Sequence, residues 1–390
     1  MEDHHQHPEH TTVAAAAAAA ANAFPTHHKA IIYDNPGQIS TRIETVPTPQ
    51  HPGPGQVLVR ITHSGVCGSD HAIMTNRWAV PPTQKGQVGG HEGVGTIVAF
   101  GPGSESLGLK MGDRVGIKWV ADCCGTCLAC LSGRDALCPQ VSISGFLGTP
   151  GTFQEYVLAP ARYVTPIPDE VPSHLAAPIL CGGVTVYAAL RKSGAQPGDC
   201  VVIPGAGGGL GHLAVQIASR GMGFRVIGID SGDKETFVRS LGAESFFDVT
   251  KYSNRVDESG SAKLASDVKA ATPRGMGAHS VIVCTNSNAA YGQALSFLTF
   301  GGSVVCVGLP EGDPTPIGGA IPNVMVAQEL RIVGSAVGNR RDAIETLDMA
   351  ARGIVRTQCT MEPMSGLTGV FERMEEMKLQ GRVVIDMMRE

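Results

Sequence analysis

The chain has 390 residues, more than one hydrophobic core usually organises, so its length predicts two or three domains. Its 30 basic and 35 acidic residues give a net charge of -5 at pH 7, which excludes the basic surface that a nucleic-acid-binding protein needs. No run reaches the roughly 18 apolar residues of a membrane-spanning helix, and the acidic start lacks the basic and apolar regions of a signal peptide. We therefore expect a protein of the cytoplasm, with no membrane or nucleic-acid partner, whose eleven cysteines are thiols or metal ligands.

Residues 1–28 are rich in histidine and alanine. Residues 14–21 are all alanine, and no lysine or arginine precedes Lys29. This composition predicts a disordered extension, although its histidines could also bind metal ions adventitiously.

Residues 29–181 have the pattern of a mainly β domain. Short apolar runs, such as residues 57–61 and 95–99, are separated by glycine and proline. These runs predict the short strands of a barrel-like domain with functional loops.

The stretch from Cys67 to His91 carries a candidate metal site within this domain. Cys67 and His91 are strong zinc ligands in glycine-rich turns, and Ser69, Asp70 and Glu92 lie beside them in the sequence. A catalytic zinc ion needs three protein ligands and one open position, so a third ligand must come from elsewhere in the chain. The alternative is a small buried cysteine and a hydrogen-bonded histidine without metal.

A second cysteine group follows at Cys124, Cys127, Cys130 and Cys138, with Cys123 left over. Four thiolates at this spacing close a tetrahedron around zinc and leave no open position, which indicates a structural ion that stabilises its loop. An iron–sulfur cluster is the alternative, but the last gap is too long and no second set of cysteines exists.

From about residue 173 the pattern changes to alternating helices and strands. Helical spacing runs from 173 to 189; strands are predicted at 201–203, 225–229, 280–283 and 303–307, and helices at 210–219, 234–241 and 289–298. This alternation predicts an α/β domain over residues 182–336, with a parallel sheet covered by helices on both faces. Residues 337–390 add predicted helices at 342–352 and 367–378 and a strand at 383–386; the pattern does not say which domain they join.

A glycine loop lies between the first predicted strand and helix of this domain. Its members are Gly205, Gly207, Gly208, Gly209, Leu210 and Gly211. Bare glycines let the backbone approach a pyrophosphate, although the spacing is one residue longer than the usual dinucleotide-binding motif. Asp230 ends the next strand, where an acid binds ribose hydroxyls and repels a 2′-phosphate, so we expect NAD rather than NADP.

Cys181 precedes the α/β domain, at the junction that faces the crevice between domains. That position makes it the candidate third zinc ligand, although a residue that packs a helix would fit equally well.

With these residues together, the chain resembles the zinc-dependent medium-chain alcohol dehydrogenases, most closely the yeast and fungal cytosolic ethanol-oxidising type. The resemblance runs from about Lys29 to the C-terminus. The motifs that carry it are the four-cysteine group, the glycine loop and residues 89–93, 116–119, 178–181 and 333–340.

The resemblance implies a GroES-like catalytic domain, an inserted Rossmann domain, a C-terminal segment that returns to the catalytic domain, two zinc ions, NAD and a homotetramer. It implies that Cys67, His91 and Cys181 bind the catalytic zinc, with Glu92 as an alternative ligand and Asp70 as the partner of His91. Further implied roles are a substrate pocket at Trp78, Trp119 and Leu309, nicotinamide contact at Val307, pyrophosphate contact at Arg382 and ribose contact at Lys234.

The implied reaction interconverts a small primary alcohol such as ethanol and its aldehyde. Zinc acts as a Lewis acid, Ser69 accepts the alcohol proton and the nicotinamide accepts hydride. Two positions depart from the family: Gly68 replaces a residue that is often basic, and Ala72 replaces the usual relay histidine, with His71 as the nearest imidazole. The alternatives are a zinc-dependent reductase or polyol dehydrogenase of the same fold, or a non-catalytic zinc- and NAD-binding protein.

Overall fold

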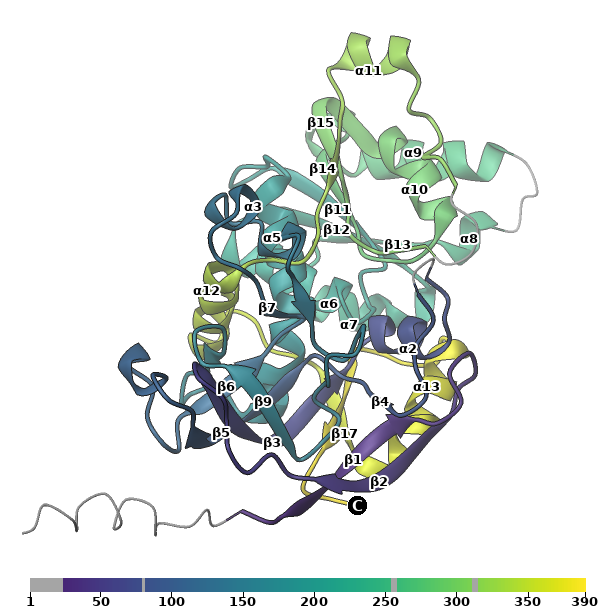
Figure 1. Ribbon diagram of the computed structural model, residues 1–390. Helices are drawn as coiled ribbons and strands as arrows, with labels where there is room; N and C mark the ends of the chain where they lie inside the picture. Colours follow the sequence, from purple (N-terminus) through teal and green to yellow (C-terminus); the bar gives the residue numbers. More distant parts are fainter. Residues whose placement is uncertain (1–23, 79–80, 254–257, 311–314) are drawn as a thin grey trace, which may run out of the picture.

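The computed structural model describes residues 24–78, 81–253, 258–310 and 315–390. Two large sheets organise these residues: a seven-stranded sheet that contains both early and late strands, and a six-stranded parallel sheet from the middle of the chain. In Figure 1 the first lies among the purple, blue and yellow segments, and the second belongs to the teal and green part above them.

The first part of the chain is mainly β, as its sequence predicts. Its strands are β1 (His27–Tyr33), β2 (Thr41–Pro47), β3 (Gln56–Val66), β4 (Gln87–Val88), β5 (Gly93–Phe100), β6 (Arg114–Ile117), β7 (Val120–Asp122), β8 (Ser142–Ile143), β9 (Tyr156–Pro160) and β10 (Thr165–Pro166). The central strand is β3, which pairs with β5, β9 and β18. Because β3 is covered on both faces, Val57, Leu58 and Val59 are all completely buried.

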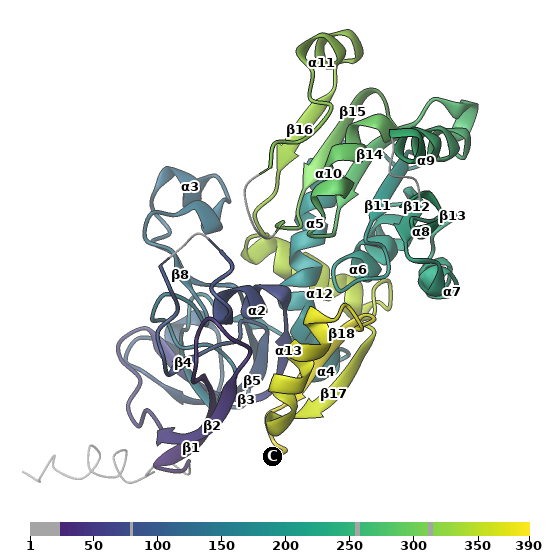
Figure 2. The same cartoon turned by 90° about the vertical axis from the view of Figure 1, so that its right-hand side faces the viewer.

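The C-terminal strands complete this sheet. Strand β18 (Arg382–Asp386) pairs antiparallel with β3 and parallel with β17 (Cys359–Pro363). Figure 2 shows these yellow strands and α13 (Leu367–Glu375) beside the early part of the chain. The last segment therefore joins the same sheet as the early strand β3.

The six-stranded sheet has the order β13-β12-β11-β14-β15-β16, with all pairs parallel. Its strands are β11 (Cys200–Pro204), β12 (Arg225–Asp230), β13 (Ser245–Asp248), β14 (Ala278–Val283), β15 (Leu298–Cys306) and β16 (Arg331–Gly334). The chain starts at β11 in the middle and builds outward in both directions, which is the doubly wound order of dinucleotide-binding domains.

Helices cover both faces of this sheet, because its strands are apolar on both faces. Helices α5 (Gly182–Lys192), α6 (Gly211–Gln216) and α7 (Glu235–Ser240) share one hydrophobic cluster with it; α9 (Glu258–Ala270) and α10 (Asn288–Ala294) share the other. The α/β class predicted from the alternation is confirmed.

The remaining α-helices lie mostly in the first and last parts of the chain. They are α2 (Gly68–Met74), α3 (Leu128–Leu131), α4 (Ser173–Ala176), α8 (Thr250–Ser253), α11 (Pro322–Gln328) and α12 (Arg340–Ala351). Within the described ranges no single helix is long and apolar enough to cross a membrane, and one pair bent by 47°, Ser173–Leu180 with Gly182–Lys192, meets the length and composition test only together.

Several predicted boundaries were wrong. The helix expected over 173–189 is interrupted at Cys181, and Leu298 begins β15 instead of ending a helix. Helix α13 stops at Glu375, because Met377 has a positive φ of 54°.

The predicted end of the N-terminal extension, at residue 28, was also wrong. Its residues 1–23 lie outside the described part of the chain, but His27 and His28 begin β1. The His28 ring is buried and bonds Thr48 and Gln154, at 3.0 and 3.1 Å.

Candidate functional site

Four potential metal ligands from three separate segments meet in the interior. Cys67 precedes α2, His91 and Glu92 lie between β4 and β5, and Cys181 precedes α5. One donor atom from each of the four lies within 4.8 Å of the others. The fold thus brings together the ligand set expected from distant parts of the sequence.

Asp70 connects the start of α2 to His91. One carboxylate oxygen accepts the backbone N–H of Cys67 at 2.9 Å, which completes a capping box at the helix start. The other lies 2.9 Å from His91 Nδ1 and accepts the N–H of Gly90 at 3.2 Å. A carboxylate at Nδ1 fixes the tautomer that leaves Nε2 free as an acceptor.

The group is chemically suited to a zinc ion. His91 Nε2 and Glu92 Oε2 are completely buried and have no hydrogen-bond partner among the described residues. Buried polar atoms without partners are costly, and a cation bound between them and the two thiols would satisfy both. Gly65 makes room here, because a Cβ at this position would lie 2.0 Å from Glu92 Oε2.

The charges of the group are strongly coupled. A hydrogen bond with Cys181 lowers the pKa of Cys67 well below its usual range, although burial opposes the shift. Burial raises the pKa of Glu92 to about 8, although Arg382 opposes it. Burial would lower the pKa of His91, but Asp70 raises it well above its usual value. These shifts show how little solvent screens the group.

An aromatic wall lies beside the metal ligands. The Trp119 ring stands edge-on to His91, with 4.8 Å between ring centroids, and Trp78 stands edge-on to Trp119 at 6.0 Å. Phe146 contacts both tryptophans at 6.4 Å and was not expected from the sequence. Leu309 is 60% exposed and is not part of the hydrophobic cluster around these rings, so the structure does not bring this third expected pocket residue to them.

The glycine loop connects β11 to α6 at the carboxyl edge of the parallel sheet. Gly205 has a φ of +78°, and a Cβ at Gly211 would lie 2.0 Å from the Gly205 carbonyl oxygen, so both positions require glycine. Asp230 ends β12 beside the loop and accepts the N–H of Gly207 at 2.8 Å. Lys234 Nζ lies 3.1 Å from the same carboxylate, so it reaches this position although the spacing looked one residue short.

Two further expected cofactor residues lie along this edge. Arg382 is buried, forms an ion pair with Glu92 and lies beside the loop, because a Cβ at Gly209 would be 3.0 Å from its Cδ. Val307 follows β15, and its N–H donates to the Tyr291 hydroxyl at 3.1 Å. Gly68 is exposed, and a Cβ added there would meet nothing within 4 Å.

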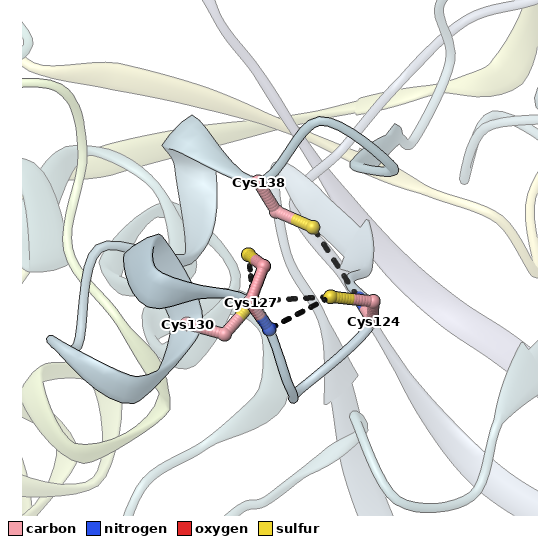
Figure 3. A group of neighbouring side chains, drawn as sticks. All are labelled: Cys124, Cys127, Cys130 and Cys138. Atoms are coloured by element: carbon pink, nitrogen blue, oxygen red, sulfur yellow. Dashed lines mark hydrogen bonds between the residues drawn. The ribbon is translucent and has the colours of Figure 1, made fainter.

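The four cysteines of the second group converge around α3, as Figure 3 shows. One sulfur from each lies within 4.8 Å of the others. Backbone N–H groups of Thr126 and Cys127 lower the pKa of Cys124 to about 6, which favours the thiolate form that zinc binds. Cys123 is buried beside the group but outside this set of four.

The residues of the expected proton path point in different directions. Ser69 Oγ lies 3.8 Å from Cys67 Sγ. His71 is turned toward α13, where its Nε2 lies 3.0 Å from a Glu375 carboxylate oxygen. Ala72 is buried in the family's relay position and carries no base.

A parallel sheet with a glycine loop and an acid at its carboxyl edge, next to a buried Cys, His and Cys set, defines a zinc- and NAD-dependent dehydrogenase. Two family models match the chain: the alcohol dehydrogenase GroES-like domain over residues 53–169 and the zinc-binding dehydrogenase domain over residues 209–352. The chain belongs to the zinc-dependent alcohol dehydrogenases.

Curated relatives agree with this assignment. Alcohol dehydrogenase 2 of Emericella nidulans is 55% identical over 94% of this chain and 99% of its own length. The alcohol dehydrogenase of Schizosaccharomyces pombe is 41% identical over 92% and 97%.

Solved structures share the fold. An acetophenone reductase from Geotrichum candidum in complex with NAD has a TM-score of 0.78 at 28% identity, over 93% of this chain and 98% of that one. The alcohol dehydrogenase of Aeropyrum pernix also has a TM-score of 0.78, at 29% identity over 92% and 99%. The GroES-like and Rossmann architecture, the fungal type and the use of zinc and NAD are thus confirmed, and the chain is an enzyme that interconverts alcohols and carbonyl compounds.

Proposed function

We propose that the chain acts on small primary alcohols such as ethanol and their aldehydes, with Cys67, His91 and Cys181 as the catalytic zinc ligands and Glu92 as an alternative ligand. The observation that carries this proposal is the free, buried His91 Nε2 beside the Trp119 ring. Large rings next to the open ligand position leave room for a short chain and little room for branched substituents.

The residues around the site have distinct roles. When bound, zinc supplies Lewis-acid polarisation of the alcohol oxygen and NAD accepts the hydride. Asp70 holds His91 in the ligating tautomer, and the tryptophans and Phe146 exclude water from the reacting atoms. Arg382, Asp230 and Lys234 lie where they would hold the pyrophosphate and ribose of NAD.

The alcohol proton must leave by a path other than the family's usual relay, because Ala72 stands in place of the relay histidine. We assign its acceptance from the alcohol to Ser69, whose hydroxyl lies 3.8 Å from the sulfur of the proposed ligand Cys67. His71 is engaged with Glu375 and Ala72 has no base, so Ser69 passes the proton to water.

Rates of reduced NAD formation across a set of alcohols test the substrate assignment. We expect kcat/KM to be highest for ethanol and propan-1-ol and at least about tenfold lower for propan-2-ol, because the aromatic wall excludes a second substituent. The variant Trp78→Ala should narrow that difference, whereas Leu107→Ala, at an exposed position outside the cluster around the tryptophans, should not. A wild-type preference for secondary alcohols, ketones or polyols would instead favour the reductase or polyol alternative.

We further propose that copies of the chain associate through β16 and assemble into a homotetramer. Strand β16 ends the parallel sheet, so its outer backbone edge is free among the described strands. Exposed apolar side chains lie on and near it: Phe300, Ile321, Val326 and Ile332 are between 38% and 78% exposed. Light scattering of wild type should give four chains per particle, and Ile332→Asp should dissociate the assembly.

The cytoplasm is the compartment we propose, because all eleven cysteines are free thiols and those assigned to zinc must stay reduced to bind it. We propose domain boundaries at 181/182 and 336/337. The first boundary, expected at 28/29, moves to before His27, because His27 and His28 begin β1.

A further inference from the structure

Lys118 and Trp119 are neighbours whose side chains contact different parts of the molecule. They lie between β6 and β7, and the Trp119 ring contacts His91 in the metal site. The Lys118 side chain is buried, and its Nζ donates to the Tyr163 carbonyl oxygen at 2.9 Å. The contacts that fix the Lys118 side chain can therefore also fix the position of Trp119 beside the metal site.

Tyr163 connects Lys118 to the four-cysteine loop. Its hydroxyl donates to Asp135 at 2.6 Å, and Asp135 lies three residues before the zinc ligand Cys138. Lys118 Nζ also lies 4.3 Å from the centre of the Tyr163 ring, and the Arg340 guanidinium lies 5.7 Å from it. A continuous set of contacts thus runs from the structural zinc loop through Tyr163 and Lys118 to Trp119.

An amine at this depth is unusual and must be held by specific contacts. Burial and, to a smaller extent, the charge of Arg340 lower the pKa of Lys118 to about 7, although the charge of Asp135 opposes the shift. Charged or neutral, the amine donates the hydrogen bond to Tyr163, and the ring face gives it a further contact.

Backbone and packing contacts also hold this segment. The Ser144 N–H donates to the Trp119 carbonyl oxygen at 3.0 Å, and Val120 packs with Tyr163 in one hydrophobic cluster. A pocket of about 420 Å³ borders Lys118, Val120 and Tyr163 on one side. The hydrogen bond from Lys118 is the side-chain contact that ties the segment to Tyr163 and, through it, to the four-cysteine loop.

We propose that Lys118 is a positioning residue that ties the structural zinc loop to Trp119 and thereby fixes the wall of the substrate pocket. The proposal rests on the role given above to the tryptophan wall. It gives the four-cysteine loop a function beyond stability, because the position of Asp135 sets that of Tyr163 and Lys118.

The two tryptophans of the chain provide a readout that needs no turnover. Trp78 and Trp119 are the only tryptophans and both line the site, so tryptophan emission reports the wall alone. The experiment compares zinc-loaded wild type with Lys118→Met, which keeps an unbranched side chain but lacks the terminal amine, and Tyr163→Phe, which removes only the hydroxyl that reaches Asp135. Lys110→Met, an exposed lysine just before β6, is the matched control.

We expect both test variants to keep two zinc ions and an unchanged KM for NAD, and to show a shifted tryptophan emission maximum. Their KM for ethanol should rise about fivefold or more, the scale of one lost buried hydrogen bond, with Lys118→Arg recovering part of the loss. Lys110→Met should behave as wild type.

The proposal is overturned if zinc-loaded Lys118→Met keeps the wild-type emission and ethanol KM, or if its losses affect ethanol and NAD equally. Should Lys118→Met fail to fold, Tyr163→Phe decides alone by the same two readouts. Because emission needs no substrate, a wild type that does not oxidise ethanol would refute the proposed substrate and leave this test intact.

Discussion

At the scale of single residues, position within the fold decides which of several similar side chains does chemistry. Two histidines separated by 20 residues show this: His91 is oriented by Asp70 with one nitrogen free, whereas His71 is turned to Glu375. The sequence analysis singled out both histidines and the proposed zinc ligands, because cysteine and histidine in glycine-rich turns are typical of metal sites. Phe146 and Gly65 were missed, because an aromatic residue and a glycine carry no metal chemistry and gain their roles only from neighbours in space.

The first prediction concerns Asp230 and the choice of cofactor. Asp230→Ser removes the charge that would repel a 2′-phosphate and releases Lys234 to attract one, so the ratio of kcat/KM for NADP to that for NAD should rise about tenfold or more. Steady-state kinetics with both cofactors measures this ratio. Asp233→Ser, an exposed acid on the next turn, is the control and should leave the ratio unchanged. Equal use of NADP by the wild type would contradict the assignment.

The second prediction concerns the proton path. His71→Ala should change kcat/KM at neutral pH by less than about tenfold, below the 10²–10⁴ of a working general base, because the imidazole faces Glu375. Ala72→His should raise the rate at low pH, where water accepts protons poorly. Glu375→Gln serves as a control that breaks the ion pair and keeps the imidazole. A hundredfold loss in His71→Ala with zinc and stability unchanged would place this histidine in the relay.

At the scale of elements, the central strands of the parallel sheet and most of the helices that cover it were predicted, whereas the 13-residue helix α9 was missed. The parallel strands appear as apolar runs because both of their faces are covered by helices. Helix α2 and strand β16 escaped prediction: α2 depends on the Asp70 capping box, and β16 is exposed and pairs on one side only. The helix break at Cys181 was also not predicted. The apolar pattern continues through this position, and the break brings the proposed ligand Cys181 to the metal site.

The third prediction tests the four-cysteine loop as an element held by metal. Its apolar side chains are mostly exposed, as at Leu128 and Leu131, so few contacts other than zinc hold it. Cys124→Ser should lose one zinc ion per chain and lower Tm by about 10 °C or more. Metal analysis and calorimetry measure the two effects. Cys123→Ser, one residue away and outside the set of four, should keep both ions; if both variants behave alike, the assignment of ligands is wrong.

At the scale of the whole molecule, the site exists only because the chain folds back on itself. The proposed ligands come from before α2, before β5 and before α5, and the late residue Arg382 contacts both Glu92 and the glycine loop. Sequence patterns predicted both domains, and the return of the last strands to β3 came from the resemblance, because a helix and strand pattern does not say which sheet a strand joins. No sequence pattern predicted the contacts of Asp135, Tyr163 and Lys118 that connect the zinc loop to Trp119.

The measurement that tests the account most directly is zinc content together with ethanol-dependent reduction of NAD in wild type and Cys67→Ser. Serine is a good N-cap residue, so the start of α2 should be kept while a zinc ligand is lost. We predict about two zinc ions per chain and ready NAD reduction in wild type, and about one ion, an unchanged fold and at least about a thousandfold lower kcat/KM in the variant. A variant that keeps its activity, or an active wild type with one zinc ion or none, would contradict the account.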